Sequence, residues 1–194
     1  MRDKLVRYFS ALSSLSEAEA TAIRDSAVVR EYPKGTVLLR EGQFSTDTYF
    51  VLDGLVRQYS LLDGTERTTG FFGADQWVLS LNDETEPRPS LHTWVCDEDS
   101  ILVVGNEELA REMFNEHPRL ETVARLVLER TFSAYQQAMA AHLLATPEQR
   151  YLRLLEKRPD LLQRVQQYHL ASYIGVTPES LSRIRKRISR REAG

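Results

Sequence analysis

The chain contains 194 residues with a formal net charge of −3 and a single cysteine. This length allows one large domain, or a medium domain with a small one, and the ordinary apolar content predicts a folded protein. The lone Cys96 excludes an internal disulfide and any site that needs several thiolates. No apolar run reaches about 18 residues and the first residues lack the apolar centre of a signal peptide, so we expect a cytoplasmic protein without a membrane span.

The charge is unevenly distributed along the chain. Residues 146–194 hold eleven Lys/Arg against five Asp/Glu, a net charge of +6, whereas residues 1–145 carry a net charge of −9. Such asymmetry points to nucleic acid or another anionic surface as a partner. Cations also suit the C-terminal end of a helix, so the same charges fit a solvated helix end. Charge alone leaves both interpretations open.

The N-terminal half is predicted to be a short helical segment followed by a β-domain. Ser16 and Glu19 have the spacing of a capping box. From Val28 to about Val104, short apolar and β-branched runs alternate with turns such as Asp53-Gly54 and Asp63-Gly64. Gly and Asp tolerate the positive φ of tight hairpin turns, and turns that recur about every ten residues predict an antiparallel sandwich or roll.

A loop and a long helix are expected next. The segment Leu81–Ser90 is polar and contains two prolines, which predicts a loop. The pattern from Glu107 to about Leu144 is helical, with a heptad-like stripe made of Leu120, Val127, Ala134 and Ala141 and an adjoining row of Ala124, Thr131 and Ala138. The small residues would let two helices approach closely, which favours a homodimer. Alternatively, the stripe packs on the protein's own β-domain.

The C-terminal stretch has the pattern of two short helices joined at a glycine. Gly175 can end the first helix in the left-handed conformation, Thr177 is a strong N-cap for the second helix, and Pro178 suits its first position. The inward face of the second helix is apolar, at Leu181, Ile184 and Ile188. With a basic outer side, this arrangement predicts a helix-turn-helix rather than an ordinary helical hairpin.

Double-stranded DNA is the partner that this motif predicts. The second helix would enter the major groove with its N-terminus first, where Arg183 suits guanine O6 and N7 and Glu179 suits a cytosine amino group. Arg185, Lys186, Arg187 and the Ser180 hydroxyl are better placed for phosphates. The predicted DNA-binding residues are Thr177, Glu179, Ser180, Ser182, Arg183, Arg185, Lys186 and Arg187.

The whole order of elements resembles the cyclic-AMP receptor and fumarate–nitrate regulator (Crp/Fnr) family of bacterial transcription factors. The resemblance covers nearly the whole chain and is carried by Pro33–Gly42, Tyr49–Arg57, Glu98–Ser100 and Thr177–Arg183. In the family, the Glu and Arg that match Glu179 and Arg183 contact bases. The C-terminal half is most similar to the short members common in Bacteroidetes-type bacteria.

The resemblance implies an α+β fold in three parts. An N-terminal antiparallel β-roll, like the jelly roll that binds cyclic nucleotides, with flanking helices would span residues 1–110. A long connecting and dimerisation helix would span 111–145, and a helical helix-turn-helix domain would span 146–194. The sequence stops soon after Arg191, so we also expect it to lack the β-wing that many relatives carry.

The family's cyclic-AMP cassette is altered in this chain. The cassette opens with a Gly-Glu pair and closes with an Arg-Ser/Thr-Ala run, whose Arg neutralises the cyclic phosphate. Here Asp75-Gln76 stands at the opening and Ser90-Leu91-His92 near the closing position, which therefore lacks the arginine. A buried phosphate without that cation loses its charge-assisted hydrogen bonds. We expect that cyclic AMP does not bind in the family's manner.

The roll is left with two alternatives. It holds another small-molecule effector, in a pocket formed by Asp75, Gln76, Trp77, Ser90, His92 and Ser133, or its cavity is filled by Phe72, Trp77 and Trp94. We expect no metal or cofactor, because the sequence contains no cysteine cluster and its histidines offer no evident pair of axial haem ligands.

The function expected from these observations is that of a dimeric DNA-binding transcription regulator with a palindromic operator. The alternative is a small-molecule-sensing module that acts through protein partners. An enzyme is not expected, because no Ser/His/Asp order, P-loop or convergent metal cluster is present in the sequence.

Overall fold

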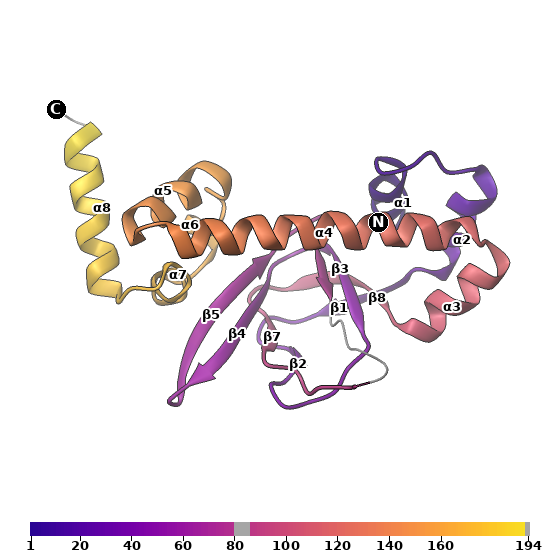
Figure 1. The fold of residues 1–194 in the computed structure, drawn as a ribbon, viewed down its shortest axis with the longest axis horizontal. Helices are drawn as coiled ribbons and strands as arrows, with labels where there is room; N and C mark the ends of the chain where they lie inside the picture. Colours follow the sequence, from indigo (N-terminus) through magenta and orange to yellow (C-terminus); the bar gives the residue numbers. More distant parts are fainter. Residues whose placement is uncertain (80–85, 193–194) are drawn as a thin grey trace. The chain divides into compact units, whose positions relative to one another are not determined.

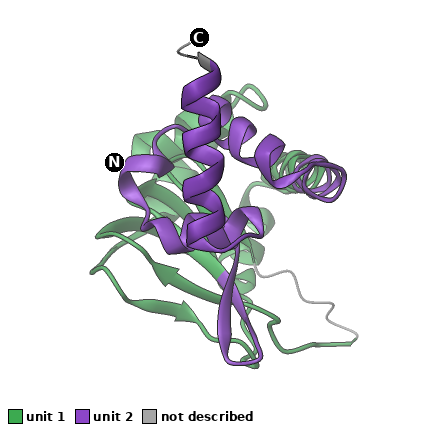
Figure 2. Ribbon diagram, turned by 90° about the vertical axis from the view of Figure 1, so that its left-hand side faces the viewer, with its two compact units in different colours: residues 1–58, 71–134 green, residues 59–70, 135–194 purple. Residues whose placement is uncertain are grey.

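The structure, a computed structural model, describes residues 1–79 and 86–192 (Figure 1). The first part of the loop expected over Leu81–Ser90 lies outside the described residues. The chain divides into two compact units, coloured separately in Figure 2: residues 1–58 with 71–134, and residues 59–70 with 135–194. The α+β class and the antiparallel β-roll expected from the sequence are confirmed.

The roll is built from two four-stranded sheets. In one sheet the strand order is β1-β8-β3-β6, and in the other it is β2-β7-β4-β5. The strands are β1 (Val28–Tyr32), β2 (Val37–Leu39), β3 (Thr48–Asp53), β4 (Val56–Leu62), β5 (Thr65–Phe72), β6 (Trp77–Leu79), β7 (Thr93–Cys96) and β8 (Ser100–Gly105). The helices of the first unit are α1 (Arg2–Ser10), α2 (Glu17–Ser26), α3 (Glu107–Glu116) and the first part of α4 (Arg119–Leu144).

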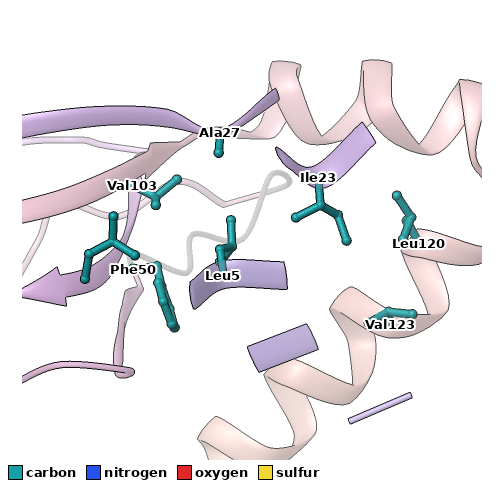
Figure 3. Close-up of a cluster of buried hydrophobic side chains, with 8 residues drawn as sticks. Leu5, Ile23, Ala27, Phe50, Val103, Leu120 and Val123 are labelled. Carbon is teal, nitrogen blue, oxygen red and sulfur yellow. The ribbon is translucent and has the colours of Figure 1, made fainter. Parts of the chain in front are cut away.

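Strand β3 is apolar on both faces, because each face of its sheet is covered. Phe50 and Leu52 join a cluster with residues of α1, α2 and α4, shown in Figure 3, in which Ile23 lies between Val103 of the sheet and Leu120 of α4. Tyr49 and Val51 point to the opposite face, into a second cluster inside the roll. Because successive side chains of a strand point to opposite faces, the apolar residues of β3 contribute to two separate clusters.

Local signals in the sequence locate several element ends. Ser16 and Glu19 form the expected capping box at the start of α2, and Arg119 donates to the same Glu19 carboxylate at 2.8 Å. Asp63 and Gly64 both have positive φ in the turn between β4 and β5, which is the geometry that a tight hairpin requires.

The helical stretch expected over residues 111–145 is interrupted in the structure. Helix α3 ends at Glu116 and α4 begins at Arg119. Pro118 is the cause, because proline disfavours the helical region for the preceding residue, and His117 accordingly has a φ of −132°.

The second unit is a helical domain with its own core. It contains the end of α4 together with α5 (Pro147–Lys157), α6 (Leu161–Arg164), α7 (Gln167–Ile174) and α8 (Pro178–Glu192). Its fully buried side chains include Leu161, Leu170, Ile174 and Leu181. Thr146 caps α5 in the expected way, with Pro147 in the first turn.

The tip of the β4–β5 hairpin belongs to this second unit. The Thr68 amide donates to Ser172 Oγ of α7 at 3.0 Å, and the Tyr168 hydroxyl donates to the Glu66 carboxylate, also at 3.0 Å. The hairpin is therefore fastened to the first helix of the predicted helix-turn-helix by both backbone and side-chain hydrogen bonds.

We expect Gly54→Ala to destabilise the roll strongly. Gly54 has a φ of +93°, and an added Cβ would lie 2.3 Å from Ser100 Oγ and 2.7 Å from the Asp99 carbonyl oxygen. Ser100 is buried, so the clash adds to the strain of the left-handed conformation, and the loss should exceed about 2 kcal/mol. The free energy of unfolding, from urea denaturation followed by circular dichroism, measures it.

Gly42→Ala is the matched control. Gly42 has a φ of +84°, but nothing lies within 4 Å of an added Cβ. It should cost only the backbone strain, about 1 kcal/mol. Equal losses in the two variants would contradict the proposed clash with Ser100.

Candidate nucleic-acid interface

Helix α8 has an apolar face and a charged face on opposite sides. Leu181, Ile184 and Ile188 are buried. At 100° per residue, the opposite side of the helix carries Glu179, Arg183, Lys186 and Arg190, all of them exposed. Four charged side chains therefore form a continuous stripe along the free side of α8.

The turn before α8 has the geometry that the sequence predicted. Gly175 ends α7 in the left-handed conformation, with a φ of +77°. Thr177 Oγ1 accepts a hydrogen bond from the Ser180 amide at 3.3 Å, which caps the first turn of α8. Hydrogen bonds from its own backbone amide and from Thr177 hold the pKa of the Glu179 carboxyl below its usual range, so this side chain is ionised at neutral pH.

Several predicted DNA-binding side chains have partners within the protein. Arg183 donates to Ser180 Oγ at 2.9 Å, and Ser182 Oγ accepts from Gln167 of α7 at 2.8 Å. Arg185 is half-buried, with its guanidinium carbon 5.6 Å from the centre of the Tyr151 ring. Arg187 forms an ion pair with Glu148 of α5.

These contacts divide the eight predicted residues into two groups. Thr177, Ser182, Arg185 and Arg187 contact groups that hold α8 in place, whereas Glu179, Ser180, Arg183 and Lys186 lie on or beside the exposed stripe. Arg190 was not among the predicted residues. Its spacing of seven from Arg183 was the signal that could have identified it.

Arg150 of α5 connects three elements beneath this turn. Its guanidinium donates to the carbonyl oxygen of Ile174 at the end of α7, at 2.9 Å, and to that of Ala145, at 3.1 Å. Its Nη1 also lies 3.0 Å from Nε2 of His142 on α4. Burial and the neighbouring Arg150 cation lower the pKa of His142, so its imidazole is neutral at pH 7 and can accept from the guanidinium.

The residues predicted to line an effector pocket are dispersed in the structure. Trp77 packs against Tyr8, Phe9 and Phe50, on the helix-covered face of its sheet. Asp75 and Gln76 lie in a turn that is hydrogen-bonded to β3.

The other three predicted pocket residues lie elsewhere. Ser90 donates to the carbonyl oxygen of His92 at 2.8 Å, and burial lowers the pKa of that histidine. Ser133 is exposed on α4. The structure does not bring the six residues into one cavity.

The described inside of the roll contains a buried cluster of aliphatic and aromatic side chains. Tyr49 lies edge-on to Trp94, with ring centres 6.4 Å apart, and Phe72 packs on the same cluster. Burial raises the pKa of Tyr49 well above its usual range and that of the enclosed Cys96 thiol to about 11. Of the three side chains expected to fill the cavity, Phe72 and Trp94 belong to this cluster, while Trp77 lies on the other face of its sheet and Tyr49 packs beside Trp94.

The residues present do not fit a cyclic nucleotide between the sheets. Among the described residues of the first unit, the buried cation is Arg57, and its Nε donates to Asp97 at 3.0 Å. A cyclic phosphate needs a cation that is not already paired with a carboxylate. We therefore assign no role to a cyclic nucleotide at this position.

The long helix α4 carries an apolar stripe that the sequence analysis missed. Leu120 and Val127 of the predicted stripe are buried in the first unit, so that part packs on the protein's own domain. A different row is exposed, at Leu128, Phe132, Tyr135, Met139 and Leu143. Its spacing of four, three, four and four residues could be read from the sequence, but the neighbouring alanine-rich row was chosen as the stripe instead.

Comparisons with known proteins agree with this architecture. Residues 29–117 match the family model of the cyclic nucleotide-binding domain. No curated protein matches the sequence significantly.

Solved structures share the fold over most of the chain. The c-di-GMP responsive global regulator CLP of Xanthomonas campestris is 19% identical with a TM-score of 0.69, and the match covers 91% of this chain and 93% of that one. FixK2 of Bradyrhizobium japonicum is 20% identical with a TM-score of 0.68 and 86% of both chains covered. The catabolite activator protein of Thermus thermophilus is 20% identical with a TM-score of 0.54, and 93% of this chain and 87% of that one are covered.

Fold and matched segment together define a protein with a cyclic nucleotide-binding domain followed by a helical unit. More closely, the chain has the fold of the Crp/Fnr family of transcription regulators, to which these structural neighbours belong. The neighbours are regulators rather than enzymes. Within the described residues, no helix is long and apolar enough to cross a membrane, and no group of three or more His, Cys, Asp or Glu side chains could hold a metal ion.

We expect Arg150→Lys to destabilise the helical unit by about 1–3 kcal/mol. A lysine ammonium cannot reach the Ala145 and Ile174 carbonyl oxygens with the same planar fork, so the end of α7 loses its partner. Arg153→Lys is the control, because Arg153 donates to the Ala141 carbonyl oxygen on the exposed surface. Thermal unfolding followed by circular dichroism compares them, and indistinguishable melting would refute the role given to Arg150.

Proposed function

We propose that this protein is a dimeric transcription regulator that reads a palindromic operator through α8. The observation that carries the proposal is the exposed stripe of Glu179, Arg183, Lys186 and Arg190 on a helix whose opposite face is fully packed. A helix presented in this way can lie in the major groove, where ionised carboxylate and guanidinium groups distinguish base pairs. Such a regulator would act in the cytoplasm, as a DNA-binding protein and not as an enzyme.

The division of labour along α8 follows from the contacts. Arg183 and Glu179 are proposed to read bases, while Lys186, Arg190 and the Ser180 hydroxyl are proposed to contact phosphates. Arg185 and Arg187 belong to the same predicted interface, and their pairing with Tyr151 and Glu148 gives them the further role of orienting the helix. Thr177 and Ser182 act in the same way through the N-cap and Gln167.

Dimerisation is proposed to occur through α4. Residues 132–140 are exposed in the single chain, including Phe132, Tyr135 and Met139. An isolated helical segment with large apolar side chains is marginal in water, whereas a second copy would bury them with coiled-coil spacing. Two copies would then present two α8 helices to the two halves of a palindrome.

Arg183→Ala and Lys186→Ala separate base reading from phosphate binding. Arg183→Ala should lower the preference for the selected operator over a scrambled duplex, by about 1–3 kcal/mol per half-site. Lys186→Ala should weaken both duplexes alike and lower the slope of log K against log salt by about one per half-site. Fluorescence anisotropy at several salt concentrations measures both quantities.

The operator for this experiment comes from selection of bound sequences out of a random DNA pool. Equal loss of discrimination in the two variants would refute the assignment of Arg183 to bases. Selection that returns no enriched sequence would refute the regulator proposal itself and favour a sensing module that acts through protein partners.

We expect Met139→Glu to weaken the dimer at least about tenfold. A carboxylate in the centre of an apolar helix seam is desolvated without a partner, at a cost above about 1.4 kcal/mol. Gln137→Glu adds the same charge about 200° around the helix, away from the stripe, and should leave the association unchanged. Sedimentation equilibrium measures the dissociation constants, and a shift of equal size in both variants would exclude this face as the seam.

A further inference from the structure

A pocket of about 940 Å³ opens on the helix-covered side of the first unit, outside the roll. One wall is the outer face of the β1-β8-β3-β6 sheet, and the others are formed by α1, α2, α3 and α4. The volume lies within the range that small-molecule sites occupy. The pocket lies on the opposite face of the sheet from the buried cluster of Tyr49, Val51 and Trp94 inside the roll.

Helix α3 turns its apolar face toward this pocket, where Met113 and Phe114 also pack against the buried cluster of the first unit. Leu109, Ala110, Met113 and Phe114 line the pocket and are all half-buried, while the remaining face of the helix is charged and exposed. No residue of α3 is fully buried. An amphipathic helix normally covers its apolar stripe within its own domain, so this stripe has space for an occupant.

The deep part of the pocket is apolar. Phe9, Ile23, Trp77, Val103 and Val127 contribute to its wall from five different elements. Ile23 and Val103 also belong to the neighbouring buried cluster in Figure 3, so this wall is firmly supported. A hydrocarbon chain or an unsubstituted ring system is the chemistry that such a surface binds.

The other end of the pocket is polar and acidic. Thr48 of β3 pairs with Gly105 of β8, which places Asp47 and Asn106 at the same edge of the sheet. Asn106 Oδ1 is used as the N-cap of α3, and Glu107 forms an ion pair with Arg111. Asp47 is the other carboxylate at this end; it accepts a hydrogen bond from the Tyr49 hydroxyl, which leaves its negative charge and further acceptor positions for an occupant. No Lys or Arg is among the described lining residues.

We propose that this pocket binds a small amphipathic molecule with an apolar body and a cationic head group, the head at Asp47 and the body against Trp77. Charge complementarity selects the class, because an anionic head would face carboxylates without a compensating cation. The site is separate from the roll interior and from α8. It gives the regulator an effector class that differs from cyclic nucleotides, but the binding itself does not depend on the proposed DNA interaction.

Three probes of equal chain length test the class: decylammonium, 1-decanol and decanoate, titrated into the full chain by isothermal titration calorimetry without DNA. Decylammonium should bind most tightly, decanol about fivefold more weakly and decanoate weakest of the three. Decanoate binding as tightly as decylammonium would overturn the proposed head group. If none of the three probes binds, the proposed site is wrong. A second copy of the chain that fills the pocket would give this result.

Matched variants locate the binding. Asp47→Asn should weaken decylammonium about fivefold and leave decanol unchanged, whereas Glu108→Gln, an exposed residue of α3 outside the lining, should alter neither. Ala110→Phe should weaken binding of all probes, because the added ring occupies part of the pocket beside α3. Unaltered affinity in Asp47→Asn or in a folded Ala110→Phe would refute the location.

A second readout does not depend on the Ala110→Phe variant. In Trp94→Phe, Trp77 is the remaining tryptophan of the two in the sequence. Titration with 10-bromodecylammonium should quench its fluorescence by at least half at saturation, because the bromine at the end of the chain would lie against the indole. Saturable binding without quenching would place the apolar body elsewhere and overturn the proposal.

Discussion

The structure of the first unit depends on one sheet that is buried on both of its faces. Along β3, Phe50 and Leu52 support the helices while Tyr49 and Val51 fill the roll. The inner side chains form the buried cluster of the roll, and a separate pocket lies between the outer face of the sheet and the helices. A single constraint, alternation along a strand with no polar face, therefore determines both the core of the roll and the sheet wall of the proposed pocket.

In the second unit, the packed side of α8 and the proposed recognition surface lie on opposite sides of the same helix. Leu181, Ile184 and Ile188 fix one side of α8, and the Gln167–Ser182 hydrogen bond and the Arg187–Glu148 ion pair fix its flanks. Arg150 stabilises the turn between α7 and α8 by donating a hydrogen bond to the Ile174 carbonyl oxygen. The proposed recognition surface would need this support, because side chains that read bases must be held on a rigid element. Helix α4 belongs to both units, and it carries pocket residues at its beginning and the exposed apolar row farther along.

Local sequence signals were sufficient to predict helix ends and turns at positions where a residue type has one strongly preferred conformation. The capping box of Ser16, the N-cap of Thr146 and the left-handed Gly175 all occur where the sequence predicted them. The same reasoning failed at Pro118, which was present in the sequence but was read as part of a continuous helix. It also failed on α4, where periodicity identified a stripe without determining whether the partner was the chain itself or a second copy.

The sequence by itself determined the order of the elements, the helix-turn-helix and the charge of its outer helix, because capping, turn chemistry and periodicity act over a few residues. Only the tertiary structure decided which charges are already paired, as for Arg187 with Glu148, and which aromatic side chains fill the roll. It also dispersed the predicted effector residues and placed the cavity outside the roll. These properties depend on contacts between residues far apart in the chain, and no local pattern encodes the distance between such residues.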